Sequence, residues 1–427
     1  ISLAAADGTV TNTGTIEASG SEGGQVAMEG ARVGQFGTIH ADGTSGDGGN
    51  VDLWASDVAA LSSDSLTTAN AGLDGDGGEI IVYSPDTALF WPDATIEAKG
   101  GAVSGDGGFV EVSGKEHVEV YGLVDATAPY GLTGTFFIDP ANVSLTTVGS
   151  PANGGWGGGD PDTWTPTGTD SKVDADAQLA SASVIVNTNN NAGQEGDISV
   201  DQVITDSTGN SLTLQAADDI ILNQNIDLSG AAGNITLWAD WGGGDEASDD
   251  AGAIIDGGGT ITMGTGDLTM TAGDGIGASG NPIETVGLTD VAAATDTGGI
   301  FINNTGSGNI NVSSVGGTNG LTTTTSGNIS VTNSAGNISL AQAITTESDG
   351  TITLDAGTNV IDTGDQIVNA GAGSITFTSD SINLGTTVDR IVTTGAINLQ
   401  PATATTAIGI GGAAAAYQLD DAEIAAI

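Results

Sequence analysis

An acidic residue followed by two glycines recurs four times in the first third of the chain, each time directly before an alternating apolar stretch. The steps between the four acids are 25, 29 and 30 residues. Alternation bounded by Gly, Asp and Ser is typical of short β-strands separated by turns. The steps are too long for simple hairpins, and they fit one coil of a parallel β-helix. The four copies are SEGGQVAM, GDGGNVDLW, GDGGEIIVY and GDGGFVEV, and their acids are Glu22, Asp47, Asp76 and Asp106.

A looser repeat continues through the last 230 residues or so, in units such as GNISV from Gly327 and GTITL from Gly350. Glycine allows the tight corner between strands, because it adopts backbone conformations that other residues avoid. The apolar residue at every second position then points into a narrow core. We therefore expect an all-β fold, a parallel β-helix or β-solenoid.

The expected organisation is two solenoid blocks joined by a loop. Residues 1–145 form the block with coils of 25–30 residues, and residues 172–427 form the second block. Residues 146–171 are rich in Gly, Pro and Trp and read as a loop or junction, because their prolines forbid a central strand. Residues 172–182 have weak helical spacing. The C-terminal YQLDDAEIAAI is compatible with a short helix, with Asp420 or Asp421 as its N-cap.

Composition excludes several classes of function. Asp and Glu number 54 against 5 Lys and Arg, which gives a formal net charge of −49. Five cations cannot neutralise a row of phosphates, so nucleic acids and anionic membrane surfaces are excluded as main partners. No apolar run approaches the ~20 residues of a membrane span. The chain has no cysteine, which excludes disulfide and thiolate chemistry.

The stretch GGFVEVSGKEHVEVYGLVDATAPYGLTGTFFIDPANVSL, from Gly107 to Leu145, resembles the filamentous-haemagglutinin-like exoproteins of two-partner secretion systems. GIGASGNPIETVGL, GGIFINNTG and the terminal YQLDDAEIAAI are also similar to segments of that family. The resemblance implies a right-handed β-helix, export through an outer-membrane partner, and a role as an adhesin or surface filament. A cysteine-free chain agrees with such export, because a periplasmic disulfide would obstruct threading through a pore. The chain opens directly on a strand-like pattern, so we expect it to begin inside a larger precursor.

The four repeated acids are the candidate metal ligands of the sequence. Stacked on successive coils, Glu22, Asp47, Asp76 and Asp106 would form a column of like charges that calcium could relieve. The alternative is that each acid only makes a corner turn in water. Two interpretations also remain open for the asparagines that follow a repeat glycine: amide ladders between coils, or simple turn formers. These are Asn234, Asn309, Asn328 and Asn337.

Tryptophans are the candidate contact residues for a ligand or a neighbouring subunit. Trp156 and Trp164 lie in the Gly-rich loop, where they could stack on sugar rings, pack on another copy, or fold back onto the solenoid. Four others lie at the ends of expected strands: Trp54, Trp91, Trp238 and Trp241.

Catalysis is not expected. Paired carboxylates such as Asp218 and Asp219 occur in polysaccharide-cleaving β-helices, but the accompanying Gly-His-Gly and Arg-Ile-Lys motifs are missing. His40 and His117 are expected to be exposed strand residues. A polysaccharide-cleaving enzyme is therefore the third choice.

The first choice is a secreted structural protein of an extracellular fibre or surface filament, with an adhesive or biofilm-matrix role. A solenoid exposes strand edges at its ends, and no capping element precedes Ile1 while the other end finishes on apolar AEIAAI. Head-to-tail self-association would cover both edges. The second choice is a monomeric carbohydrate-binding segment of a longer exoprotein, located at the cell surface.

Overall fold

The computed structural model describes residues 1–146, 171–189, 195–242, 251–413 and 415–427. Over these residues the chain is an all-β parallel β-solenoid of about 14 turns, as the repeats predict. Contacts divide the chain into two compact units, one built mainly from residues 1–202 and the other mainly from residues 218–427. None of the helices in the described part of the chain is both long and apolar enough to cross a membrane.

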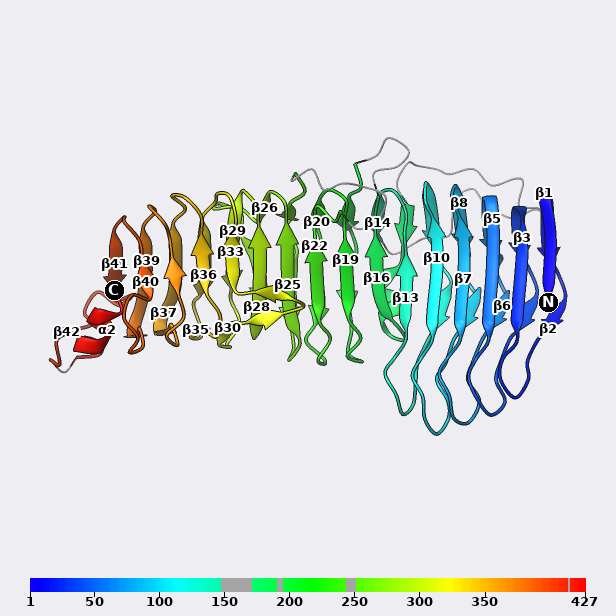
Figure 1. The fold of residues 1–427 in the computed structure, drawn as a ribbon, viewed down its shortest axis with the longest axis horizontal. Coiled ribbons are helices and arrows are strands. Elements are labelled where there is room, and N and C mark those ends of the chain that lie inside the picture. Colours follow the sequence, from blue (N-terminus) through cyan, green and yellow to red (C-terminus); the bar gives the residue numbers. More distant parts are fainter. Residues whose placement is uncertain (147–170, 190–194, 243–250, 414) are drawn as a thin grey trace. The chain divides into compact units, whose positions relative to one another are not determined.

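The first unit stacks its strands in parallel register, so that β1, β3, β5, β7 and β10 follow one another side by side (Figure 1). Its large sheet contains β1 (Ser2–Asn12), β3 (Gln25–Gln35), β5 (Asn50–Leu61), β7 (Glu79–Ser84), β8 (Thr87–Phe90), β10 (Phe109–Gly114), β11 (His117–Val120), β13 (Thr135–Ile138), β14 (Val143–Leu145), β15 (Ser171–Val173), β16 (Ser183–Asn187), β17 (Ile198–Val200) and β19 (Leu212–Gln215).

The register of this sheet places the same repeat position of each coil in one buried row. Val26 pairs with Val51, Val51 with Ile80, and Ile80 with Val110. All four side chains are fully buried. The row forms because each coil returns to the same point after one repeat, so the inward residues of successive strands stack.

A smaller five-stranded sheet forms another face of the first unit, and its end is closed by a helix. The strands are β2 (Thr15–Glu17), β4 (Thr38–His40), β6 (Leu66–Thr68), β9 (Thr95–Glu97) and β12 (Leu123–Asp125). Helix α1 (Ala175–Leu179) begins at the N-cap Asp174 and buries Gln178. The Gln178 amide donates to the Gly122 carbonyl at 2.8 Å and accepts from the Val124 N–H at 3.0 Å. It thus bonds the edge of β12 as a neighbouring strand would.

The second unit repeats the design with coils of more variable length. The described strands are β18 (Ile204–Thr205), β20 (Ile220–Leu222), β21 (Ile226–Leu228), β22 (Ile235–Trp238), β23 (Ile254–Asp256), β24 (Thr260–Met263), β25 (Asp267–Ala272), β26 (Gly275–Ile276), β27 (Ile283–Val286), β28 (Asp290–Thr295), β29 (Gly299–Asn304), β30 (Ile310–Val312), β31 (Ser314–Val315), β32 (Thr318–Asn319), β33 (Leu321–Thr323), β34 (Ile329–Asn333), β35 (Ile338–Leu340), β36 (Ile344–Thr346), β37 (Ile352–Asp362), β38 (Val368–Asn369), β39 (Ile375–Asn383), β40 (Ile391–Val392), β41 (Ile397–Gln400), β42 (Ile408–Ile410) and β43 (Tyr417–Leu419).

A stack of isoleucines runs through the core of the second unit. Successive strands pair Ile for Ile in the same register, and each of these side chains is fully buried. A β-branched side chain packs well on its identical neighbour in a pleated sheet, which explains why short strands hold together here. The stack consists of Ile220, Ile254, Ile276, Ile300, Ile329, Ile352 and Ile375.

The C-terminal segment folds back onto the last coils instead of leaving them open. Helix α2 (Asp421–Ala425) has a capping box, in which Asp420 and Glu423 satisfy each other's backbone N–H groups. The carbonyl of Ala426 accepts the N–H groups of Arg390 and Ile391, both at 2.8 Å. The last residues of the chain therefore supply a hydrogen-bond acceptor to the coil that contains Arg390 and Ile391.

The expected junction at residues 146–171 lies almost wholly outside the described residues, so this division of the chain stays a prediction.

Candidate functional site

The four repeated acids form one column at a corner of the first unit, in the turns that lead into β3, β5, β7 and β10. One carboxylate oxygen of each acid accepts the backbone N–H of the residue stacked on it in the next coil. The bonds are Glu22 Oε2 to Asp47 N–H, 2.9 Å; Asp47 Oδ1 to Asp76 N–H, 2.9 Å; Asp76 Oδ1 to Asp106 N–H, 2.7 Å; and Asp106 Oδ1 to Leu132 N–H, 2.7 Å. The column therefore ties successive coils together.

The two glycines after each acid leave room for this close stacking of backbone on backbone. A Cβ on Gly78 would lie 2.0 Å from the Gly49 carbonyl oxygen, and one on Gly108 would lie 2.0 Å from that of Gly78. No side chain fits at such distances. The acid–Gly–Gly motif is thus a corner in which the glycines allow contact and the acid supplies an acceptor.

Three acids of the column, Asp47, Asp76 and Asp106, line a shallow groove of about 620 Å³. All four carboxylates are exposed, so water as well as backbone can satisfy them. Within the described part of the chain, no three of these carboxylates bring oxygens within 4.8 Å of one another, as a compact calcium site would require. The geometry thus supports a role in holding coils together and adds nothing to the calcium hypothesis.

Asparagine takes the place of the acid in the second unit. The side-chain oxygen of Asn328 accepts the N–H of Thr351 at 2.8 Å, one coil on. Asn234, Asn309 and Asn337 make the same bond, at 2.9, 3.0 and 3.0 Å, to the backbone of the following coil. These asparagines therefore form ladders between coils, but from side chain to backbone and not from amide to amide.

A buried amide pair inside the second unit was not anticipated. Asn304 and Asn333 are fully buried and adjacent in register, and the Asn304 amide donates to Asn333 Oδ1 at 3.0 Å. Asn333 in turn donates to the carbonyls of Gly308 and Asn337. Both asparagines stand at the end of a strand shortly before a Gly–Asn corner, and this spacing is the signal that could have identified them.

The tryptophans fall into different environments. Trp156 and Trp164, the candidate contact residues, lie outside the described residues. Trp54 is 47% exposed and stacks on Tyr83 of the next coil, with ring centroids 5.8 Å apart. Trp91, in contrast, is buried beside Leu89.

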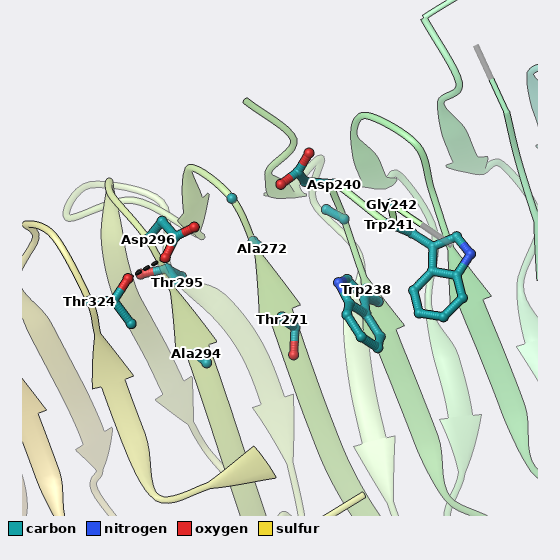
Figure 2. A pocket seen from close by; sticks show the side chains of 12 residues that line it. Trp238, Asp240, Trp241, Gly242, Thr271, Ala272, Ala294, Thr295, Asp296 and Thr324 are labelled. Atoms are coloured by element: carbon teal, nitrogen blue, oxygen red, sulfur yellow. Dashed lines mark hydrogen bonds between the residues drawn. The ribbon is translucent and has the colours of Figure 1, made fainter. Parts of the chain in front are cut away.

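Trp238 and Trp241 bound an open groove of about 480 Å³ on the second unit (Figure 2). We call it the Trp238 groove. Their rings meet edge to face, with centroids 4.3 Å apart, and both are partly exposed. The described residues that line the groove are Trp238, Ala239, Asp240, Trp241, Gly242, Thr271, Ala272, Gly273, Ala294, Thr295, Asp296 and Thr324.

The groove arises from a change in side-chain size along one outward row. Register pairs Trp238 of β22 with Thr271 of β25, and Thr271 with Ala294 of β28. Side-chain size in this row thus decreases from an indole to a methyl group across three strands, which leaves a hollow beside the tryptophans. At its far end the hydroxyl of Thr324 donates to the carboxylate of Asp296 (Figure 2).

The histidines and the paired carboxylates have structural partners. His40 Nδ1 lies 2.9 Å from the Thr68 hydroxyl. His117 is only 6% exposed and lies 3.2 Å from Glu119, so its expected exposure was wrong. Asp219 accepts the N–H of Ala253 at 2.8 Å, which makes it another bond between coils.

Neither the known family models nor the curated proteins compared with this sequence match it.

Proposed function

We propose that the chain is a secreted, non-enzymatic structural protein that belongs to an extracellular fibre or surface filament, with an adhesive or biofilm-matrix role. The observation that carries this proposal is the ladder of side-chain oxygens that bind the next coil's backbone in both units. The carboxylates and amides at the corners of the repeat are engaged in hydrogen bonds that hold successive coils together. These bonds support a structural role of the repeat.

The acidic surface agrees with an extracellular scaffold. With 54 acidic and 5 basic side chains, copies of the chain repel one another until salt or divalent cations screen them. Export through an outer-membrane partner and membership of the filamentous-haemagglutinin-like family belong to the same proposal, and their support is the resemblance of residues 107–145.

Head-to-tail association is the proposed mode of assembly. β1 pairs with β3 along one edge, and no described strand pairs with its other edge. The Ile1 carbonyl accepts the N–H of Ala27, so Ile1 faces β3. Because alternate residues of a parallel strand bond the same neighbour, the N–H of Ala4 points away from β3. At the other end of the chain, the exposed Ile408 and Ile410 of β42 offer apolar surface for a joint.

Sedimentation and negative-stain electron microscopy of the purified chain test this assembly. We expect filaments that pellet in a concentration-dependent way. Ala4→Pro should abolish them and leave the fold intact, because proline is tolerated where an edge strand's N–H faces solvent. Leu3→Pro is the comparison variant, because the N–H of Leu3 faces β3 and its loss disturbs the β1–β3 ladder itself. Monomers at every concentration would refute self-assembly, and release of reducing or unsaturated ends from polysaccharides would refute the non-enzymatic role.

A further inference from the structure

We propose that the Trp238 groove binds a neutral oligosaccharide. This inference rests on the groove alone and holds whether or not the chain assembles into fibres.

The aromatic end of the groove supplies surfaces on which sugar rings stack. The edge-to-face contact with Trp241 fixes the orientation of the Trp238 ring, and both indoles remain partly exposed. Figure 2 shows the indole nitrogen of Trp238 on the Thr271 side of the groove. An indole with one apolar face and one N–H donor suits a ligand that combines C–H faces with hydroxyl groups.

The other end of the groove supplies hydrogen-bond acceptors for hydroxyl groups. One oxygen of the Asp296 carboxylate accepts the Thr324 hydroxyl, which orients the carboxylate. A carboxylate has further acceptor positions on both oxygens, so Asp296 can also accept hydrogen bonds from the hydroxyl groups of a ligand. The Thr271 side chain lies between the two ends (Figure 2), and its hydroxyl can both donate and accept a hydrogen bond.

The groove has a volume suited to a short sugar chain, and the spacing between its strands is close to the length of one sugar residue. Ala272, Gly273 and Ala294 leave the hollow of about 480 Å³, which lies within the range of small-ligand sites. The paired residues of neighbouring strands lie ~4.8 Å apart. A ligand that runs across β22, β25 and β28 therefore meets one outward side chain per strand, at a spacing close to the length of one sugar residue.

Charge selects among saccharides. The described lining includes Asp240 and Asp296 and no Lys, Arg or His, within a chain of net charge −49. Uronic-acid and sulfated polymers would be repelled, since none of the described lining residues is a cation that could compensate their charge. A neutral saccharide has no such penalty.

The test is titration of the full chain with neutral hexasaccharides of glucose, mannose and N-acetylglucosamine, and with polygalacturonate as the anionic probe. Calorimetry and tryptophan fluorescence report binding. We expect at least one neutral hexasaccharide to bind and polygalacturonate not to bind. Trp238→Ala should weaken the binding by about tenfold or more, because it removes a stacking surface.

A second variant fills the groove and leaves both tryptophans in place. Ala294→Ile adds bulk at a partly exposed, outward strand position, where a β-branched residue is compatible with the fold. It should also weaken binding by about tenfold. The matched controls, Trp54→Ala and Ala27→Ile, change equivalent outward positions of the first unit and should leave binding unchanged.

Binding of a neutral hexasaccharide that is lost in both groove variants and kept in both controls would establish the site. Absence of binding by every neutral probe would overturn the proposal, as would affinity that survives Trp238→Ala and Ala294→Ile. Preference for polygalacturonate would overturn the assigned ligand class. The filament assay is a separate measurement, so the two proposals fail independently.

Discussion

One carboxylate oxygen of Asp76 accepts the backbone N–H of Asp106, the corresponding acid of the next coil, at 2.7 Å. The same bond joins Asp47 to Asp76 and Glu22 to Asp47. A ladder of side-chain acceptors therefore runs beside the ladder of the parallel sheet. Its bonds lie at the corners, where the strand ladder is interrupted by the turn.

Replacing Asp76 by Ala should weaken the joint between two coils. The variant loses an exposed hydrogen bond to a charged acceptor, which we expect to destabilise the unit by about 0.5–1.5 kcal/mol. Hydrogen exchange should show lower protection of the Asp106 N–H, because local opening exposes that group first. Asp76→Asn is the matched control, since its amide oxygen still accepts the bond. Equal protection in wild type and Asp76→Ala would contradict the ladder.

Removal of calcium should leave the melting temperature unchanged. Each acid of the column already binds a backbone N–H, and among the described residues no three of these acids bring their oxygens together. The measurement is calorimetric melting in calcium and then in excess chelator. A fall of several degrees in chelator that disappears in Asp76→Asn would instead assign a metal to the column.

The corner glycines should not tolerate a side chain. Gly108→Ala would place a Cβ 2.0 Å from the Gly78 carbonyl oxygen, so the coils must separate. We expect a loss of about 1–3 kcal/mol, as for overpacking in a core. Gly14→Ala is the control, because a Cβ there meets no atom within 4 Å. Since alanine restricts the unfolded chain, Gly14→Ala should be neutral or slightly stabilising, so urea unfolding should show a loss of stability in Gly108→Ala and none in Gly14→Ala.

The hydrogen bonds between Gln178 and β12 should contribute more to the stability of the first unit than exposed hydrogen bonds do. Gln178 is fully buried and replaces a strand at the edge of the small sheet. Gln178→Ala leaves the Val124 N–H and the Gly122 carbonyl without that partner, at a cost of about 1–3 kcal/mol. Urea unfolding measures the loss, with the exposed Gln25→Ala as control. Similar stability of the two variants would show that water replaces the amide.

The coil, its buried rows and its corners could be predicted because they depend on local spacing. A glycine pair fixes where the chain turns, and the period-two pattern fixes which residues point inward. The acid column follows from these two facts, since equal positions on successive coils stack. The hydrogen-bond partners of these acids could not be predicted, because the same spacing is compatible with water, a metal ion or the backbone as the partner.

Features that depend on what covers an outward face could not be predicted. His117 lies at an outward position of β11, so alternation predicts exposure, yet it is 6% exposed. The Trp238 groove needed the identity of the residues one and two coils further on, Thr271 and Ala294. Coil lengths vary in the second unit, so the sequence does not show which residues pair in register with Trp238.

Glu111 should make the first unit more stable at low pH than at neutral pH. Burial raises the pKa of its carboxyl, and the nearby Asp139 and Glu79 act in the same direction. A raised pKa in the folded state means that folding favours the neutral acid. The stabilisation is therefore complete below the pKa of the unfolded chain, and it is lost as the pH rises through the higher folded value.

Glu111→Gln removes this dependence, because the amide is neutral throughout. We expect the urea midpoint of the variant to fall less than that of the wild type between about pH 4 and pH 7, the range in which such a carboxyl ionises. Glu29→Gln, at an exposed position of β3, removes the same formal charge without the burial and serves as the control. The other carboxylates contribute equally to all three proteins, so the difference between the variants isolates Glu111. An identical pH profile for Glu111→Gln and Glu29→Gln would mean that the buried carboxyl is solvated by water that enters the face of β10.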